Sequence, residues 1–158
     1  MRTPLTIILM ALAGAAGAHE PMEWNGSKIH VLLERDGTEG SMGMFTTQSS
    51  APGGPPLHIH EDAGEALFVL EGRAEFQSGD QYVTLGAGEV VFVPRGVDHT
   101  FHFPDATGGK LLVIVTPGGF EGFFSATRHL KLPDQLDELS RISAGFGQVF
   151  TGPPLGAH

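Results

Sequence analysis

The stretch PPLHIHEDAGEALFVLEG, Pro55 to Gly72, indicates the fold class of this chain. It holds two histidines one residue apart, then a carboxylate, and then an apolar run that ends in glycine. In a β-strand, residues i and i+2 share a face, so His58 and His60 point the same way. Ala63-Gly64 permits a bend, which can bring Glu65 back beside the two histidines.

A second stretch, PRGVDHTFHF, adds another histidine just after a Pro-x-Gly turn. Strand alternation places His99 on the same face as Phe101 and Phe103, and Thr100 and His102 on the other. If the two phenylalanines face the core, His99 faces it as well.

Three imidazoles and one carboxylate that face inward need partners, because an unpaired buried polar group is costly. Any one of these histidines alone is more simply a surface residue near a turn, but the matching parity of the set favours a metal site. Imidazole suits first-row divalent metals from Mn to Zn, and the carboxylate extends the range toward Fe and Mn. The expected ligands are His58, His60, Glu65 and His99, and the metal is one of Fe, Mn, Ni, Cu, Co or Zn.

The rest of the chain consists of short apolar runs separated by turn residues. With 23 Gly and 11 Pro in 158 residues, this pattern predicts an all-β sandwich or barrel rather than a helical bundle. Ser78-Gly79-Asp80 predicts a hairpin. The expected strands are Lys28–Glu34, Ser41–Gln48, Glu65–Gly72, Ala74–Ser78, Gln81–Leu85, Glu89–Pro94, Asp98–Phe103 and Lys110–Thr116.

These two histidine-bearing segments resemble the two motifs of the cupin superfamily. The first motif fits from His58 to Gly72, although its leading Gly position is occupied by Pro52. The second fits at Gly88, Pro94, Gly96 and His99, with Phe103 in place of its final Asn. The similarity covers residues 28–117 and implies a cupin jelly-roll β-barrel whose metal is held by His58, His60, Glu65 and His99.

The segments PGGFEGFF and FGQVFTGPPL are also similar to the ends of single-domain cupins named quercetin dioxygenase-like. That resemblance implies a dioxygenase-type reaction on an apolar or phenolic molecule, with Glu65 as a catalytic base. Two other functions stay open. One is a secreted cupin that binds a metal or small molecule without turnover, and the other is an O₂-independent lyase or isomerase with Glu65 or Tyr82 as base.

The expected substrate pocket is apolar and comprises Met42, Met44, Leu67, Phe101 and Phe103. No lysine or arginine is placed to hold a phosphate beside the metal, so an aromatic or apolar substrate fits better than a phosphosugar. The expected partner is therefore a small molecule.

The chain ends predict further organisation. Residues 1–18 have one cation, an apolar core and a small-residue end, which is typical of a cleaved secretory signal peptide and predicts a periplasmic or extracellular protein. Residues 19–27 are expected to be a flexible segment, 28–117 the cupin barrel, and 118–158 one or two short helices with an irregular tail. The chain has no Cys, which excludes disulfides.

The charge balance limits the possible partners. Removing residues 1–18 takes away Arg2 and changes the formal charge from −9 to −10. So acidic a chain is a poor match for nucleic acid or an anionic membrane surface. A homodimer is possible, because a small barrel leaves strand edges that need cover.

Overall fold

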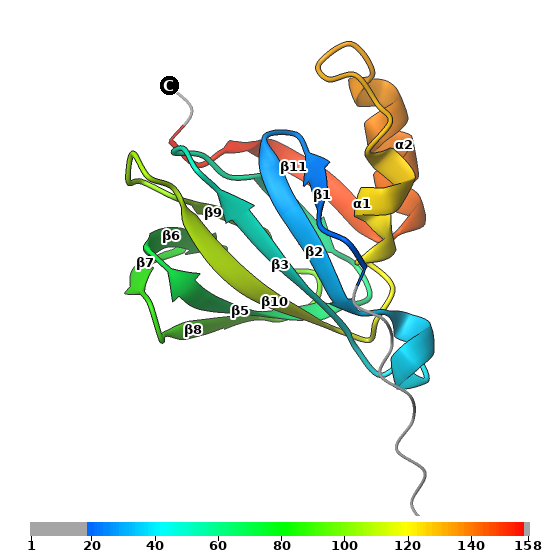
Figure 1. Cartoon of the computed structure of the whole chain (residues 1–158), viewed down its shortest axis with the longest axis horizontal. Helices are drawn as coiled ribbons and strands as arrows, with labels where there is room; N and C mark the ends of the chain where they lie inside the picture. The colour runs from blue at the N-terminus through cyan, green and yellow to red at the C-terminus, as the bar shows by residue number, and fades with distance from the viewer. Residues whose placement is uncertain (1–18, 157–158) are drawn as a thin grey trace, which may run out of the picture.

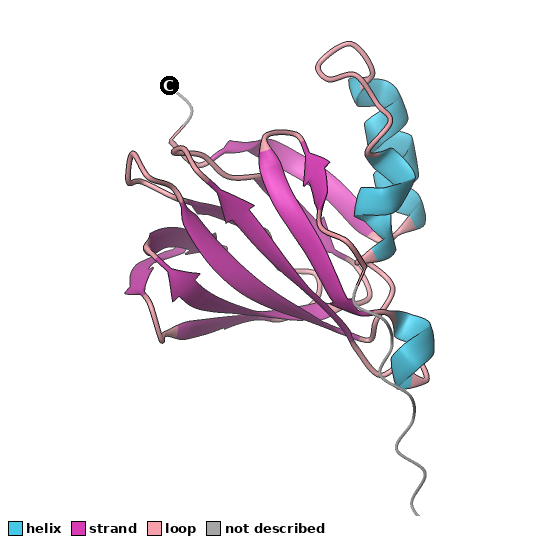
Figure 2. Cartoon of the chain, viewed as in Figure 1, coloured by secondary structure: helices cyan, strands magenta, loops and turns pink. Residues whose placement is uncertain are grey.

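The computed structural model describes residues 19–156, and the predicted signal peptide lies outside them. Eleven described strands form two antiparallel sheets that face each other (Figures 1 and 2), as the jelly-roll prediction requires. The six-stranded sheet has the order β1-β2-β3-β10-β5-β8, and the five-stranded sheet the order β11-β4-β9-β6-β7.

The strand bounds agree closely with the apolar runs of the sequence. They are β1 Met22–Trp24, β2 Ser27–Leu33, β3 Gly43–Ser49, β4 Pro56–His60, β5 Gly64–Glu71, β6 Arg73–Ser78, β7 Gln81–Gly86, β8 Val90–Val93, β9 His99–His102, β10 Gly109–Thr116 and β11 Gln148–Pro154. The hairpin predicted at Ser78-Gly79-Asp80 joins β6 to β7.

The core lies between the two sheets and follows the period of two. On β10, Leu111, Val113 and Val115 are buried while the residues between them are only half-buried. On β5, Leu67 and Val69 are buried in the same way. Burying these aliphatic chains stabilises the fold by roughly 1.5–3 kcal/mol each.

Two strands lie in segments for which the sequence predicted no regular structure. Met22–Trp24, within the segment expected to be flexible, pairs with β2 as the edge of the larger sheet. Gln148–Pro154, expected to be an irregular tail, pairs with β4 as the edge of the smaller sheet. An edge strand tolerates proline because one side of it needs no ladder hydrogen bonds.

The described helices are η1 Arg35–Thr38, α1 Gly122–Thr127 and α2 Leu136–Gly145. The two predicted C-terminal helices are thus present, and they stand side by side next to β11 and β1 (Figure 1). Phe123, Phe124 and Leu139 are their buried apolar contacts with the barrel. No helix in the described part of the chain is long and apolar enough to cross a membrane.

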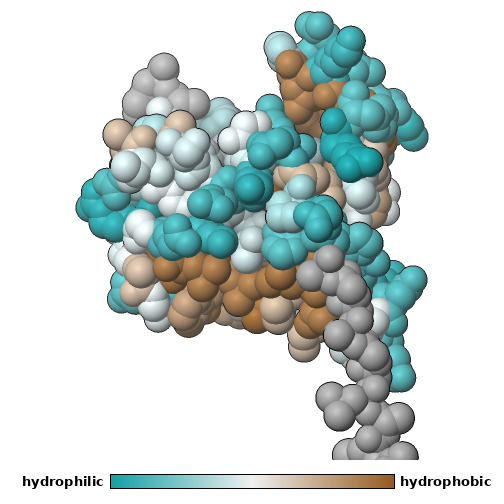
Figure 3. All heavy atoms as spheres, viewed as in Figure 1, coloured by the Kyte–Doolittle hydropathy of each residue, from teal (hydrophilic) through white to brown (hydrophobic). Residues whose placement is uncertain are grey.

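One part of the surface is apolar. Figure 3 shows a brown band along the lower part of the molecule, where β5 and β8 lie in Figure 1. Leu70, Val90 and Phe92 are 37%, 57% and 60% exposed, and β8 is an edge strand.

Candidate metal centre

Three histidines and one glutamate meet inside the barrel. Each of His58, His60, Glu65 and His99 offers one ligand atom, and these atoms all lie within 4.8 Å of one another. All four side chains are at most 5% exposed. They come from β4, β5 and β9, so residues 41 positions apart in the chain share one site.

Strand geometry explains the convergence. His58 and His60 are buried on the inner face of β4, and Ile59 between them is only half-buried. His58 pairs directly with His99 across the β4–β9 ladder. The backbone N–H of Gly96 donates to the carbonyl of His60 at 2.7 Å, so the Pro-x-Gly turn that precedes His99 is fixed against the His-x-His strand.

Backbone carbonyls orient two of the imidazoles. Nδ1 of His58 lies 2.7 Å from the carbonyl of Pro56, and Nδ1 of His99 lies 2.9 Å from that of Val97. A carbonyl only accepts, so each Nδ1 carries a proton and each Nε2 is left to face the centre of the site. Hydrogen bonds of this kind commonly orient histidines that bind metals.

Within this cluster, His60 is the histidine whose ring nitrogens have no hydrogen-bond partner among the described residues. Its Nε2 lies 3.2 Å from Oε1 of Glu65, but neither ring nitrogen makes a hydrogen bond with the described residues. The side chain is 2% exposed, and an unpaired buried polar group is costly. A divalent cation between the histidines and Glu65 would remove that cost, so the donor set of three nitrogens and one carboxylate fits a transition metal.

The electrostatics of the cluster are those of a site prepared for a cation. Burial, together with the charge of His99, lowers the pKa of His58 to about 3. Burial alone would raise the pKa of Glu65, but the nearby imidazole of His60 and the charge and hydrogen bond of His99 hold it well below its usual range. Burial would likewise lower the pKa of His99, but its 3.0 Å hydrogen bond to Glu65 raises it. At neutral pH, a neutral His58 and an ionised Glu65 are both in their metal-binding forms.

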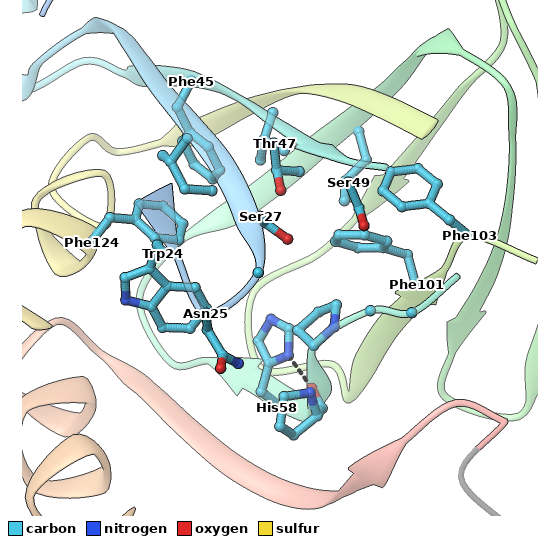
Figure 4. Close-up of a pocket in the computed structure, with 18 of the residues that line it drawn as sticks. Trp24, Asn25, Ser27, Phe45, Thr47, Ser49, His58, Phe101, Phe103 and Phe124 are labelled. Carbon is cyan, nitrogen blue, oxygen red and sulfur yellow. Dashed lines mark hydrogen bonds between the residues drawn. The ribbon is translucent and has the colours of Figure 1, made fainter. Parts of the chain in front are cut away.

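Three of the four cluster residues, His58, Glu65 and His99, lie in the wall of a cavity of about 360 Å³, and His60 faces a neighbouring pocket. Trp24, Phe101, Phe103, Phe120 and Phe124 are among the aromatic residues that line it (Figure 4). Its described lining contains no lysine or arginine. A flat apolar molecule fits such a lining better than a phosphate ester does.

The predicted pocket residues divide into two groups. Leu67, Phe101 and Phe103 line the cavity, but Met42 and Met44 do not. Met42 precedes β3. Along β3, Phe45, Thr47 and Ser49 line the cavity, so Met44 lies on the opposite face. The prediction for the two methionines was wrong because it took the wrong parity for this strand.

The sequence reasoning missed Trp24 as a pocket residue. The indole N–H donates to the Thr127 hydroxyl at 2.8 Å and the ring packs on Phe123 and Phe124, which joins β1 to α1. An available signal was Asn25-Gly26, a hairpin dipeptide whose residues have φ of 45° and 80°. Tyr82, considered above as a base, is 65% exposed on β7 and does not line the cavity.

Comparison with known proteins agrees with this geometry. The family model described as "Cupin domain" matches residues 46–115, which include all four candidate ligands. A cupin described as RmlC-like from Shewanella frigidimarina has a similar structure, with a TM-score of 0.55 and 24% identity over 63% of this chain and 84% of that one.

Two curated relatives show how far the similarity extends. An uncharacterised protein of Streptomyces coelicolor is 29% identical over 93 residues, which are 59% of this chain and 82% of the relative. Quercetin 2,3-dioxygenase of Aspergillus japonicus is 35% identical over 88 residues, 52% of this chain but only 25% of that enzyme. The chain therefore matches a quarter of the length of the Aspergillus enzyme.

Proposed function

The chain carries a cupin domain, and on that basis we propose that it is a metal-dependent dioxygenase-type enzyme for an apolar, phenolic small molecule. The observation that supports this most is that the four-residue cluster opens, through His58, Glu65 and His99, into a cavity walled by aromatic rings. The partial match to a quercetin 2,3-dioxygenase points to the same substrate class.

His58, His60, Glu65 and His99 would hold the metal. When bound there, a redox-active divalent metal supplies a Lewis acid for a phenolic oxygen and a route for electrons between the phenol and O₂. Four protein ligands leave positions free on a metal that prefers five or six.

The protein's own residues prepare the substrate. Phe101, Phe120 and Trp24 hold a flat ring by packing, and such a ring would displace water from the cavity that it fills. Glu65 is ionised at neutral pH, because its neighbouring imidazoles lower its pKa. It can therefore accept a hydrogen bond from a phenolic hydroxyl that enters the site, and it would take the proton once a bound metal had lowered the pKa of that hydroxyl.

The test is to mix the metal-loaded protein with a flavonol, first anaerobically and then with O₂. We expect a shift of the flavonol absorption band on binding and O₂ uptake on aeration. His60→Ala should abolish O₂ uptake, and His30→Ala, a half-buried histidine outside the cluster, should not. Binding without O₂ uptake would favour the non-catalytic or the O₂-independent cupin instead.

We also propose that the protein is exported and that residues 1–18 are removed. The supporting observation is the signal-peptide pattern of the sequence. N-terminal sequencing of the protein from the periplasmic or extracellular fraction should give His19 as the first residue. A cytoplasmic protein that starts at Met1 would contradict the proposal.

A further inference from the structure

One hydroxyl that faces the cavity has no partner among the described residues. Thr47 is 7% exposed and lines the cavity from β3, and it makes no side-chain hydrogen bond to any residue that the structure describes. Thr46 is also buried and makes no side-chain hydrogen bond among the described residues, but it does not line the cavity, whereas two other buried threonines are satisfied by the protein. Thr100 donates to the carbonyl of Pro55 at 2.7 Å, and Thr127 donates to that of Phe123 at 2.7 Å.

Thr47 lies far from the metal site along the sheet. The ladder across β3, β10 and β5 places Gly43, Val115 and Glu65 in one row, and Thr47 with Leu111 in another. The two rows are four residues apart along β3, which corresponds to about 13 Å of strand. Glu65 and Thr47 nevertheless line the same cavity, so one elongated molecule can reach both.

A second hydroxyl belongs to this end of the cavity. Figure 4 shows the hydroxyls of Ser27, Thr47 and Ser49 directed into the space between the rings of Trp24 and Phe101. The Ser49 hydroxyl donates to the carbonyl of Ala51 at 2.8 Å, whereas Ser27, like Thr47, has no side-chain hydrogen bond among the described residues. This end of the cavity thus offers two hydroxyls that are available to a ligand, among mostly apolar lining residues.

We propose that Thr47 and Ser27 form a distal subsite that binds a hydroxyl or carbonyl group of the ligand. The ligand class is a flat, elongated aromatic molecule with a phenolic group at one end and a second hydrogen-bonding group at the other. This inference rests on the proposed function, which supplies the contact between the phenolic end of the ligand and the metal site. It adds a preference for a hydrogen-bonding group at the other end of the ligand.

The expected selectivity follows from the unpaired hydroxyl. A ligand that carries the distal group gains a hydrogen bond with Thr47, and a ligand without it covers that hydroxyl without pairing it. One neutral hydrogen bond of this kind corresponds to roughly a tenfold difference in affinity.

The subsite can be tested by binding alone, because Trp24 is the only tryptophan and lines the cavity. Quenching of its fluorescence would be titrated with 3-hydroxyflavone and with 3,4′-dihydroxyflavone, which differ only in a hydroxyl at the far end. The wild-type protein should bind the dihydroxy compound about tenfold more tightly. Thr47→Val should remove most of that preference, and Thr47→Ser should retain it.

Two variants guard against indirect effects. Thr46→Val makes the same change on the neighbouring residue, which does not line the cavity, and should leave the preference unchanged. Ser27→Ala provides a second reduction of the preference if Thr47→Val does not fold.

The outcomes separate the two proposals. Equal affinity for both flavones in wild type and Thr47→Val would overturn the subsite, whatever the O₂ measurements show. The expected preference without O₂ uptake would support the subsite and overturn the enzyme proposal. No quenching by either compound would overturn both.

Discussion

The carboxylate of Glu121 occupies the space in which a side chain on Gly43 would have to lie. Glu121 is 3% exposed and accepts 2.7 Å hydrogen bonds from the backbone N–H groups of Arg35 and Gly119. It thereby fastens the segment at Arg35 to its own segment, Gly119 to Glu121, beside Phe120, whose ring centroid is 4.3 Å from that of His60. The position of one wall of the metal site therefore depends on a glycine two strands away from Glu65.

Gly43→Ala should destabilise the protein by about 1–3 kcal/mol, because the new methyl group would displace the Glu121 carboxylate from its hydrogen bonds. The measurement is urea unfolding of the metal-free protein. Gly145→Ala is the matched control, because nothing lies within 4 Å of its added Cβ and the residue ends α2. Its effect should be neutral or stabilising by less than about 1 kcal/mol.

A double variant tests whether the clash with Glu121 causes the loss of stability in Gly43→Ala. In Glu121→Ala the obstructing carboxylate is gone, so adding Gly43→Ala should cost less than about 0.5 kcal/mol more. An undiminished cost in that background would mean that Gly43 is required for another reason.

Metal binding should raise the thermal stability of the protein. A metal present at a hundred times its dissociation constant adds about 2.7 kcal/mol to the free energy of unfolding. We expect Mn²⁺, Fe²⁺, Co²⁺, Ni²⁺, Cu²⁺ or Zn²⁺ to raise Tm in the wild type and in His30→Ala, with about one metal per chain by mass spectrometry. His60→Ala should lose both effects, and equal metal content in that variant would place the metal elsewhere.

The metal-free protein should lose stability as the pH falls from 6.5 toward 3. Over that range the unfolded chain takes up a proton on His58, but the folded chain does so only near its lowered pKa of about 3. The loss for one such group is at most about 1.4 kcal/mol per pH unit. Glu65, whose pKa is also lowered, adds to the loss below its ordinary range.

His99 does not offset this loss in the same range. Its folded pKa is raised, so the stability that it contributes is already complete below pH 6.5 and is lost only on going to higher pH. His58→Gln should therefore flatten the dependence of Tm on pH between 6.5 and 4.5 in the metal-free protein. A slope as steep as that of the wild type would show that His58 is not responsible.

We propose that a second copy of the chain covers the exposed apolar edge at β8. Val90 and Phe92 are more than half exposed on this edge strand, next to the apolar band over β5 (Figure 3). Such an edge is prone to pairing unless it is covered. Light scattering should give the mass of a dimer for the wild type and of a monomer for Phe92→Glu, with Tyr82→Glu on β7 as the control. A wild-type monomer would contradict the proposal.

The sequence predicts the site better than the pocket around it. His58, His60 and His99 are polar residues among apolar ones, so alternation alone determines which way they face. The strand Gly43–Ser49 has no such contrast, because Met44 and Thr46 on one face match Phe45 and Thr47 on the other in polarity. Only the packing of β3 against β2 and β10 decides between them, and sequence periodicity cannot supply that.

The short strands at the edges of the sheets were the other part of the fold that the sequence did not predict. A three-residue strand such as Met22–Trp24 is too short to show any period, and Gln148–Pro154 contains the glycine and prolines that usually mark loops. Gln148–Pro154 pairs with β4, far earlier in the chain, and the short hairpin of β1 with β2 is fastened by the bond of Trp24 to Thr127, so both depend on tertiary contacts as well as on local propensity.

The position of Trp24 has a practical consequence for how the protein is prepared. The residue that closes one side of the cavity lies on the first described strand, a few positions after the predicted cleavage point. A recombinant chain cut back to Lys28, the start of the barrel as predicted from sequence, would keep all four candidate ligands but lack this wall. Binding measured on it would describe a different cavity.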